Sequence, residues 1–329
     1  HSRGFIISHS PAMASIANRH ISANEFYIEQ NTFGEKKWHA RFNYLKIGVL
    51  FKYFQLNNKE HLGNAFSISP YFKFKLYSGK RLNLLFRPSI GMAILGKKFH
   101  EKDNIENIAI GSHINMFISA AIEGEIRLAE KTNLTLGLGL DHQSNTGFQT
   151  PNLGINIPFL SAGLNYHLGE KNKLVKHQEL DFKKETAYWQ LTAGLGLNEI
   201  NPPNQKKYLV KSLAISREKK INHKSTLGYG IDLYYNPAQK ALLKQDSIFI
   251  NHYENIQIGI SILHVLHFGK LSFTSQLSYY LKSENKKLGN LYHVFGGRYL
   301  INKKTNVFFS GKTHIDKAEF ILIGIGYRI

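Results

Sequence analysis

Apolar and polar residues alternate along most of the chain, in segments of about 9 to 14 residues separated by turns rich in Gly, Asn, Lys and Asp. In the last segment, 318–329, isoleucines at every second position share one face with Tyr327, and glycines occupy the other face. Such lengths suit the roughly 9 to 11 residues that a tilted membrane strand requires, and helical periodicity is nearly absent. We therefore predict an all-β fold, an antiparallel transmembrane β-barrel of the outer-membrane type with about 14 strands (range roughly 12 to 16), rather than a soluble β-sandwich.

Two segments of the chain resemble each other weakly. Residues 132–143 and 305–316 both begin with Thr-Asn and carry a histidine near the other end. This likeness indicates a duplicated eight-strand unit, either as two barrels or merged into one. A single barrel over residues 1–329 is the preferred interpretation, because the sequence identifies no packing face between two barrels. Within it we expect a first, deacylase-like half (1–168), a connector (169–186) and a degenerate, repeat-like half that lacks the serine described below (187–329).

The composition narrows the class of partner. The chain has 42 Lys and Arg residues and a net charge of +19, which favours an anionic partner such as a phosphorylated lipid surface. Nucleic acid is disfavoured, because the basic residues are scattered and match no nucleic-acid-binding motif. There is no cysteine, so neither a disulfide framework nor thiol chemistry is expected. No apolar run is long enough for a membrane helix, and the chain begins at His1 without signal-peptide features, so we expect that any signal peptide has been removed or left out.

The stretch 139–156, GLDHQSNTGFQTPNLGIN, interrupts the alternation with polar residues. In the preceding strand, leucines at alternate positions form one face, and His142 and Ser144 continue that face. In a barrel the leucine row must face lipid, so these two polar side chains should lie outside, just beyond the hydrocarbon. Asn156 has the same parity in the next strand, and neighbouring strands are about 4.8 Å apart. We therefore expect the three side chains to converge.

This trio permits acyl transfer. Ser144 is a weak nucleophile unless a base takes its proton, and His142 is suited to do so, with Asn156 holding the imidazole. The side chain of Asn145 and the backbone N–H of Gly147 are candidates for stabilising an oxyanion. The alternative is a polar girdle at the barrel rim followed by an Asx-Pro turn, because His-x-Ser pairs are common. No cofactor and no metal site is predicted, since the dispersed histidines fit no defined ligand set.

A known family carries the same run of residues. The run His142-Gln143-Ser144-Asn145-Thr146-Gly147, then Pro151-Asn152-Leu153-Gly154, resembles the signature of the PagL-type lipid A 3-O-deacylase (acyloxyacyl hydrolase) family. The resemblance covers roughly residues 1–168 and is specific only within 142–156. It implies an eight-stranded outer-membrane barrel whose serine hydrolase site removes an ester-linked acyl chain from lipid A in the outer leaflet. It makes His142 the base, Ser144 the nucleophile, and Asn145 with Gly147 the oxyanion hole.

One position departs from the family pattern. Asn156 occupies the place of a glutamate, and an asparagine can orient a histidine but cannot stabilise the imidazolium by charge. Asp141, the nearest acid, has the opposite parity. This departure keeps open a second function, a catalytically silent barrel that is a structural or accessory subunit of a larger outer-membrane protein complex. A passive pore fits less well, because it leaves the motif unexplained.

A basic loop follows one of the earlier predicted strands. Lys97, Lys98 and Lys102 are candidates for pairing with lipid A phosphates, and a merely solvated loop is the alternative. The sequence thus predicts a protein of the Gram-negative outer membrane. Its expected partner is lipid A, or lipopolysaccharide, of the outer leaflet, and other outer-membrane proteins are further candidates.

Overall fold

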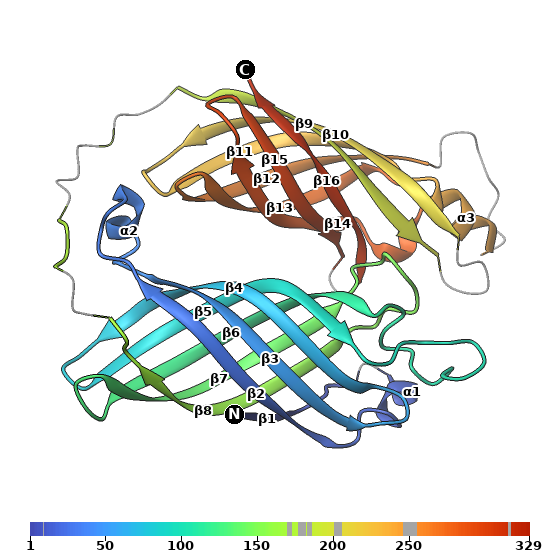
Figure 1. Ribbon diagram of the computed structural model, residues 1–329. Coiled ribbons are helices and arrows are strands. Elements are labelled where there is room, and N and C mark those ends of the chain that lie inside the picture. The colour runs from blue at the N-terminus through green and yellow to red at the C-terminus, as the bar shows by residue number, and fades with distance from the viewer. Residues whose placement is uncertain are drawn as a thin grey trace. The chain divides into compact units, whose positions relative to one another are not determined.

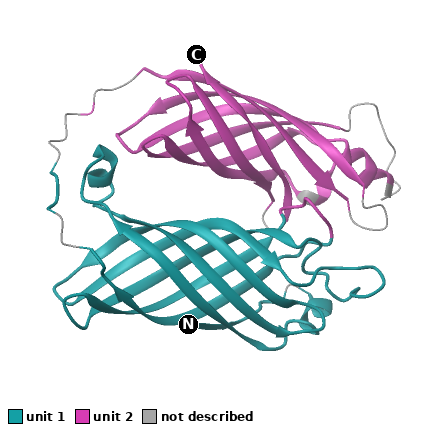
Figure 2. Ribbon diagram, viewed as in Figure 1, with its two compact units in different colours: residues 1–145, 151–178 teal, residues 146–150, 179–329 magenta. Residues whose placement is uncertain are grey.

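The strands of this chain fall into two sets of eight, and each set closes into a barrel of antiparallel neighbours (Figure 1). The computed structural model describes residues 1–8, 10–169, 173–176, 182, 186–200, 206–245, 255–314 and 317–329. Two compact units result, residues 1–145 with 151–178 and residues 146–150 with 179–329 (Figure 2). No helix in the described part is long and apolar enough to cross a membrane.

The first barrel consists of hairpins and is closed by a very short strand. Its strands are β1 (Ser2–Phe5), β2 (His20–Asn31), β3 (Lys46–Asn58), β4 (Gly63–Ser78), β5 (Leu82–Leu95), β6 (Ile114–Arg127), β7 (Thr132–Ser144) and β8 (Ile155–Tyr166). Two short helices lie in its connections, α1 (Pro11–Ala14) and α2 (Lys37–Arg41). Because β1 pairs with both β2 and β8, the sheet has no free edge.

The second barrel repeats the eight-strand arrangement. Its strands are β9 (Tyr188–Glu199), β10 (Lys207–Lys220), β11 (Ser225–Tyr235), β12 (Ile256–Phe268), β13 (Leu271–Lys282), β14 (Leu291–Leu300), β15 (Thr305–Thr313) and β16 (Ala318–Arg328). A helix, α3 (Ala238–Gln245), and a 3-10 turn, η1 (Lys286–Leu288), lie in its connections. Here β9 pairs with both β10 and β16, which closes this sheet as well.

The structure corrects the preferred prediction of one barrel with about 14 strands. The described part holds sixteen strands in two closed barrels, so the alternative of a duplicated eight-strand unit is confirmed. Closure explains the difference: once β1 pairs with β8, and β9 with β16, neither sheet keeps an edge that could join the other. The expected halves, 1–168 and 187–329, each contain one complete barrel. Most of the expected connector, 169–186, lies outside the described residues.

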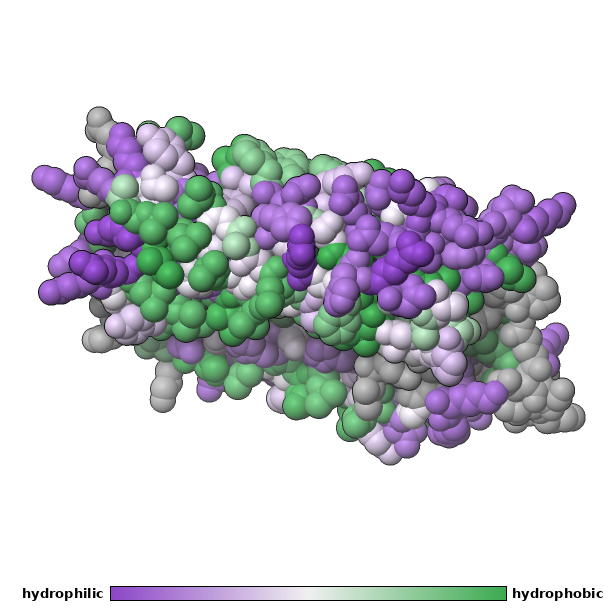
Figure 3. All heavy atoms as spheres, turned by 90° about the horizontal axis from the view of Figure 1, so that it is seen from below, coloured by the Kyte–Doolittle hydropathy of each residue, from purple (hydrophilic) through white to green (hydrophobic). Residues whose placement is uncertain are grey.

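Apolar side chains cover the outside of the first barrel. On β7, Leu136, Leu138 and Leu140 are 47%, 56% and 44% exposed. Figure 3 shows apolar side chains gathered over part of the face that it presents, beside polar side chains that extend across its middle and to both ends. The two sides of the strand therefore differ in polarity as the period-two alternation predicts.

Charged side chains fill the inside of the first barrel. Lys52, Lys73 and Arg87 are at most 2% exposed. The Lys52 ammonium lies 2.7 Å from Asp141, the Lys73 ammonium lies 2.9 Å from Glu123, and the Arg87 guanidinium lies 2.6 Å from the other Glu123 oxygen. Because each cation has a carboxylate partner, an interior of low dielectric constant can hold these charges.

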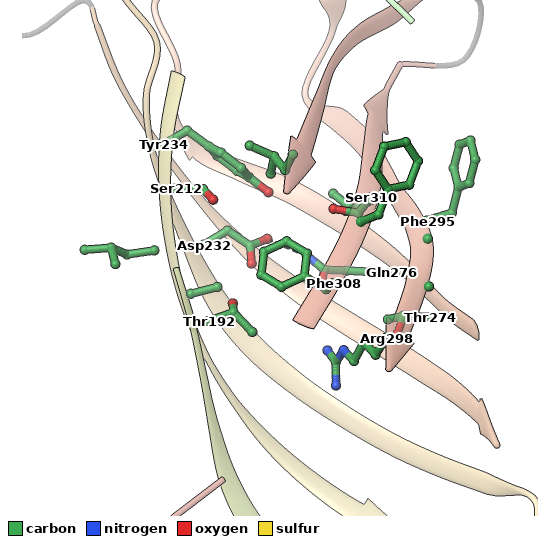
Figure 4. Close-up of a pocket in the computed structure, with 17 residues that line it drawn as sticks. Thr192, Ser212, Asp232, Tyr234, Thr274, Gln276, Phe295, Arg298, Phe308 and Ser310 are labelled. Carbon is green, nitrogen blue, oxygen red and sulfur yellow. Dashed lines mark hydrogen bonds between the residues drawn. The ribbon is translucent and has the colours of Figure 1, made fainter. Parts of the chain in front are cut away.

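The inside of the second barrel combines ion pairs with aromatic rings. Lys312 Nζ lies 2.6 Å from Glu319 and 4.9 Å from the centre of the Tyr292 ring. A cavity of about 60 Å³ lies beside Asp232 (Figure 4). The Asp232 carboxylate accepts hydrogen bonds from Gln276 at 2.6 Å and from the Tyr292 hydroxyl at 2.8 Å. Side chains of seven strands, β9–β11 and β13–β16, line this cavity.

Candidate active site

Strand β7 carries His142 and Ser144 on the same side as its leucine row. The residues that alternate with them, Asp141 and Gln143, are 0% exposed and lie inside the barrel. His142 is half-buried, and Ser144 is 3% exposed. The alternating leucines had predicted this parity, because successive side chains of a strand point to opposite sides.

The imidazole of His142 bridges two strands. Its Nδ1 atom lies 2.6 Å from Asn156 Oδ1, and its Nε2 atom lies 2.8 Å from Ser144 Oγ. The first contact follows from the register, in which His142 on β7 is paired with Asn156 on β8. The tautomer that allows both hydrogen bonds has its proton on Nδ1, so that Nδ1 donates to the amide oxygen of Asn156 and Nε2 accepts a hydrogen bond from the Ser144 hydroxyl. The structure thus brings together the three residues that were expected to converge.

Two backbone segments hold this trio, and sequence reasoning missed both. The N–H of Ile7, just after β1, donates to the carbonyl of Asn156 at 2.8 Å. Gly154, just before β8, has a φ of +78°, and a Cβ added there would lie 2.9 Å from His142 Cε1. The N–H of Gly154 donates to the carbonyl of Ala109 at 3.0 Å. Glycine lets the backbone pack directly against the imidazole, and the glycine of the Pro-Asn-x-Gly run was the signal that could have revealed this contact.

Asn145 follows the trio and is bonded through both its backbone and its side chain. Its N–H donates to Asn152 Oδ1 and its side-chain amide donates to Ser112 Oγ, both at 3.0 Å. Gly147 belongs to the other compact unit, where its carbonyl accepts the N–H of Glu199 at 3.2 Å. The oxyanion roles of Asn145 and Gly147 stay predictions.

Two family models match this chain. One is described as lipid A 3-O-deacylase (PagL) and matches residues 24–165, and the other is described as acyloxyacyl hydrolase, C-terminal domain, and matches residues 187–329. The chain belongs to the lipid A 3-O-deacylase (PagL) family. This confirms the family that the residues after His142 had indicated. The PagL match spans most of the first barrel, and the C-terminal match spans the second.

Comparisons with individual proteins add less than the PagL match. No curated protein matches the chain. Among solved structures, one mutant of the Rh. blastica porin is 9% identical and another is 10% identical, with TM-scores of 0.22 and 0.21. Each match covers 100% of this chain and 98% of the porin chain. TM-scores this low do not indicate a shared fold.

The PagL family pattern leaves the position of Asn156 unmatched. Asn156 lies beside His142 Nδ1, where an acid was expected. Asp141 is the acid nearest to the ring in sequence, but its carboxylate lies 2.7 Å from Lys52 inside the barrel. The acceptor for the Nδ1 proton is therefore the oxygen of a neutral amide, which can fix the tautomer but adds no charge.

The basic loop of this PagL-family chain lies between β5 and β6. Lys97 and Lys102 are exposed, and Lys98 is half-buried. Lys97 Nζ donates to the carbonyl of Glu60 at 2.8 Å. The pairing of these lysines with lipid A phosphates stays a prediction.

The histidine of the weak repeat has different surroundings from His142. His314 is 5% exposed, and its Nε2 atom lies 3.1 Å from Glu319 Oε2 in the second barrel. The two residues that follow it, Ile315 and Asp316, lie outside the described residues. Across the part of the chain that the structure describes, no group of three or more His, Asp or Glu residues is arranged to hold a metal ion.

Proposed function

We propose that this protein is an outer-membrane serine esterase that removes an ester-linked acyl chain from lipid A. The observation that carries the proposal is a pair of contacts of the His142 imidazole in a barrel of the PagL family, Nδ1 at 2.6 Å from Asn156 Oδ1 and Nε2 at 2.8 Å from Ser144 Oγ. Nucleophilic acyl transfer requires a hydroxyl that is hydrogen-bonded to an imidazole, with a third group that holds the other ring nitrogen.

In the proposed reaction, Ser144 Oγ attacks the carbonyl carbon of the ester while its proton passes to His142 Nε2. The C–O bond of the ester then breaks, and His142 returns the proton to the oxygen that leaves with the deacylated lipid A. Water next gives a proton to His142 and attacks the acyl-enzyme, which releases the fatty acid and restores the Ser144 hydroxyl. Asn156 keeps the other ring proton on Nδ1 throughout. Asn145 and Gly147 are the proposed donors to the oxyanion.

The surroundings of the trio suit an amphiphilic substrate. Leu138 and Leu140 precede His142 on the same side of β7 and are exposed. In a membrane this row lies against acyl chains, so an acyl ester would approach the half-buried His142 from the bilayer and not through the inside of the barrel. The proposal therefore assigns the protein to the Gram-negative outer membrane, with lipid A of the outer leaflet as its substrate. The three lysines of the basic loop (97, 98 and 102) are the proposed partners of the lipid phosphates.

Purified full-length protein in detergent, incubated with lipid A, tests this proposal. Mass spectrometry should detect a released 3-hydroxy fatty acid with the native protein and none above background with Ser144→Ala. Ser161→Ala is a matched control on β8, because Ser161 has the parity of the residues inside the barrel, and it should behave as the native protein does. Full activity of Ser144→Ala would refute the proposed nucleophile.

Asn156 favours a second candidate function. Because an amide cannot stabilise an imidazolium by charge, the trio also fits a catalytically silent barrel that serves as a structural or accessory subunit of an outer-membrane complex. If the native protein releases no fatty acid under conditions where an active deacylase does, this second function is favoured. Crosslinking in intact cells should then recover an outer-membrane partner in stoichiometric amount.

A further inference from the structure

Three hairpins at one end of the second barrel carry a lysine at the same backbone position. They join β10 to β11, β12 to β13 and β14 to β15, and their lysines are Lys224, Lys270 and Lys304. Each lysine carbonyl accepts an N–H from the next strand of the barrel, at 2.7, 2.9 and 2.8 Å in turn. The donors are His267, Leu300 and Arg328. All three lysine side chains are exposed, so the barrel's register arranges them at one end as a regular set.

Two of the three turns also share an internal hydrogen-bond pattern. Asn222 Oδ1 accepts the N–H groups of Lys224 and Ser225 at 2.8 and 2.9 Å. Asn302 Oδ1 makes the same two bonds in its own turn, at 2.9 and 2.8 Å. Such Asx turns fix the backbone, so less conformational entropy is lost when the lysine binds a partner.

The first barrel places cations in the same way. Arg81 lies between β4 and β5, and its carbonyl accepts a hydrogen bond from the N–H of Arg127 at 2.9 Å. Lys131 lies between β6 and β7, and its carbonyl accepts a hydrogen bond from the N–H of His167 at 2.9 Å. Both cationic side chains are exposed. The same position is thus cationic in hairpins of both barrels, which makes a chance distribution of lysines a poor explanation.

Aromatic and aliphatic side chains lie at the same end of the second barrel. Trp189, Tyr299 and Tyr327 are 42%, 49% and 46% exposed, and Ile221 and Ile301, within the turns, are 45% and 54% exposed. Thr305, next to Lys304, is paired with Tyr327 across β15 and β16. Exposed aromatic rings beside basic residues are typical of the boundary between a membrane and water.

We propose that this end of the second barrel binds the phosphate headgroups of anionic glycerophospholipids. Residues 219–225, 268–271 and 300–305 are all described and contain no Asp or Glu, so the side chains of these hairpins carry only positive formal charge. The lysines lie two strands apart, about 10 Å, so each can hold its own headgroup. Short hairpins are typical of the periplasmic end of such barrels, and the leaflet there consists of phospholipid. The inference rests on the outer-membrane location proposed above and not on the esterase reaction.

Calorimetric titration of the full-length protein in a nonionic detergent tests the inference. The ligands are short-chain phosphatidylglycerol, phosphatidylcholine of the same chain length, lipid A and inorganic phosphate. We expect phosphatidylglycerol to bind more tightly than phosphatidylcholine or inorganic phosphate. The triple variant Lys224→Gln, Lys270→Gln, Lys304→Gln should weaken this binding about 100-fold, since each lysine near an anionic surface contributes about fivefold. The corresponding triple arginine variant should keep it.

The matched control removes the same charge elsewhere on this barrel. Lys244→Gln, Lys286→Gln and Lys317→Gln replace three exposed lysines outside the hairpins described above, and this variant should bind as the native protein does. Equal binding of the two phospholipids, an equal loss in both glutamine variants, or a loss of lipid A binding as large as that of phosphatidylglycerol would overturn the proposal. None of these readouts depends on ester hydrolysis, so a failure here is distinguishable from a failure of the proposed esterase.

Discussion

His142 Nε2 lies 2.8 Å from Ser144 Oγ, and both side chains lie on one side of β7 with only Gln143 between them. Because side chains alternate along a strand, residues two positions apart lie on the same side. The backbone of β7 alone therefore places the His142 and Ser144 side chains next to each other. The partner for the other ring nitrogen has to come from elsewhere, and β8 supplies it as Asn156. The contributions of the two strands can therefore be tested separately.

The Ser144 hydroxyl and the His142 imidazole should act as one unit. We expect Ser144→Ala and His142→Ala each to slow fatty acid release about 1,000-fold or more, and the double variant to be no slower than either. The measurement is the initial rate with lipid A in detergent. Losses that multiply in the double variant would mean that the two side chains do not share one proton transfer.

Asn156→Asp replaces the amide beside Nδ1 by a carboxylate of the same shape. We expect release to become about fivefold faster, because a charged acceptor stabilises the imidazolium by about 1 kcal/mol more than a neutral one. Asn156→Leu removes the acceptor and should slow release about 100-fold. Steady-state kinetics check both variants, and a slower Asp variant would show that the site requires the neutral amide.

Gly154→Ala should displace the imidazole. The φ of +78° disfavours alanine, and its Cβ would lie 2.9 Å from His142 Cε1, so the ring has to move. We expect release to slow about 100-fold, as a displacement near 1 Å does in other sites. Gly163→Ala is the matched control on β8, because a Cβ there has no neighbour within 4 Å. Equal rates of fatty acid release for the two alanine variants would show that Gly154 does not position the His142 imidazole.

Lys52→Met should destabilise the first barrel. Its ammonium lies 2.8 Å from Glu25 and 2.7 Å from Asp141. Its loss leaves the buried Asp141 carboxylate without its cation and leaves Glu25 with Arg87 at 3.4 Å. We expect the free energy of unfolding to fall by about 3 to 5 kcal/mol. Lys59→Met, at an exposed lysine, should change it by at most about 0.5 kcal/mol. Urea titrations in detergent, followed by electrophoretic mobility of the folded barrel, give both values.

Leu138→Arg should weaken insertion into bilayers. Leu138 is 56% exposed on the outside of the barrel, where an arginine costs about 2 to 4 kcal/mol at the bilayer midplane. The measurement is the folding free energy in lipid vesicles, with Leu138→Ala as the control for lost side-chain volume. An arginine variant as stable as the alanine variant would mean that this side of β7 does not face lipid.

The sequence alone predicted which side of β7 each side chain lies on, and it predicted that His142, Ser144 and Asn156 converge, because both depend on the spacing of nearby residues. The strand that was expected before the polar stretch, from its alternating leucines, is β7 (Thr132–Ser144), and the parity of His142 followed from those leucines. The same local logic paired His142 with Asn156, since a hairpin brings adjacent strands into register.

The number of barrels could not be predicted in this way, because closure depends on distant pairings. Residues of β1 meet residues of β8 more than 150 positions later, and no local pattern records this contact. The same holds for Gly154, whose role depends on the meeting of three segments around Ala109, His142 and the start of β8. The ion pair of Lys52 with Asp141 also joins strands that are not neighbours.

The short strand β1 gives the first barrel a weak closing seam. It meets β8 at only three paired positions, between Ser2–Gly4 and Phe159–Ser161. Local opening of a protein begins where few hydrogen bonds have to break together, so amide exchange should be fastest along this seam. Ile7, just beyond it, ties down the carbonyl of Asn156. The rate at which the β1–β8 pairing opens, and not the free energy of unfolding of the whole barrel, then determines how often the His142 imidazole loses its hydrogen bond to Asn156.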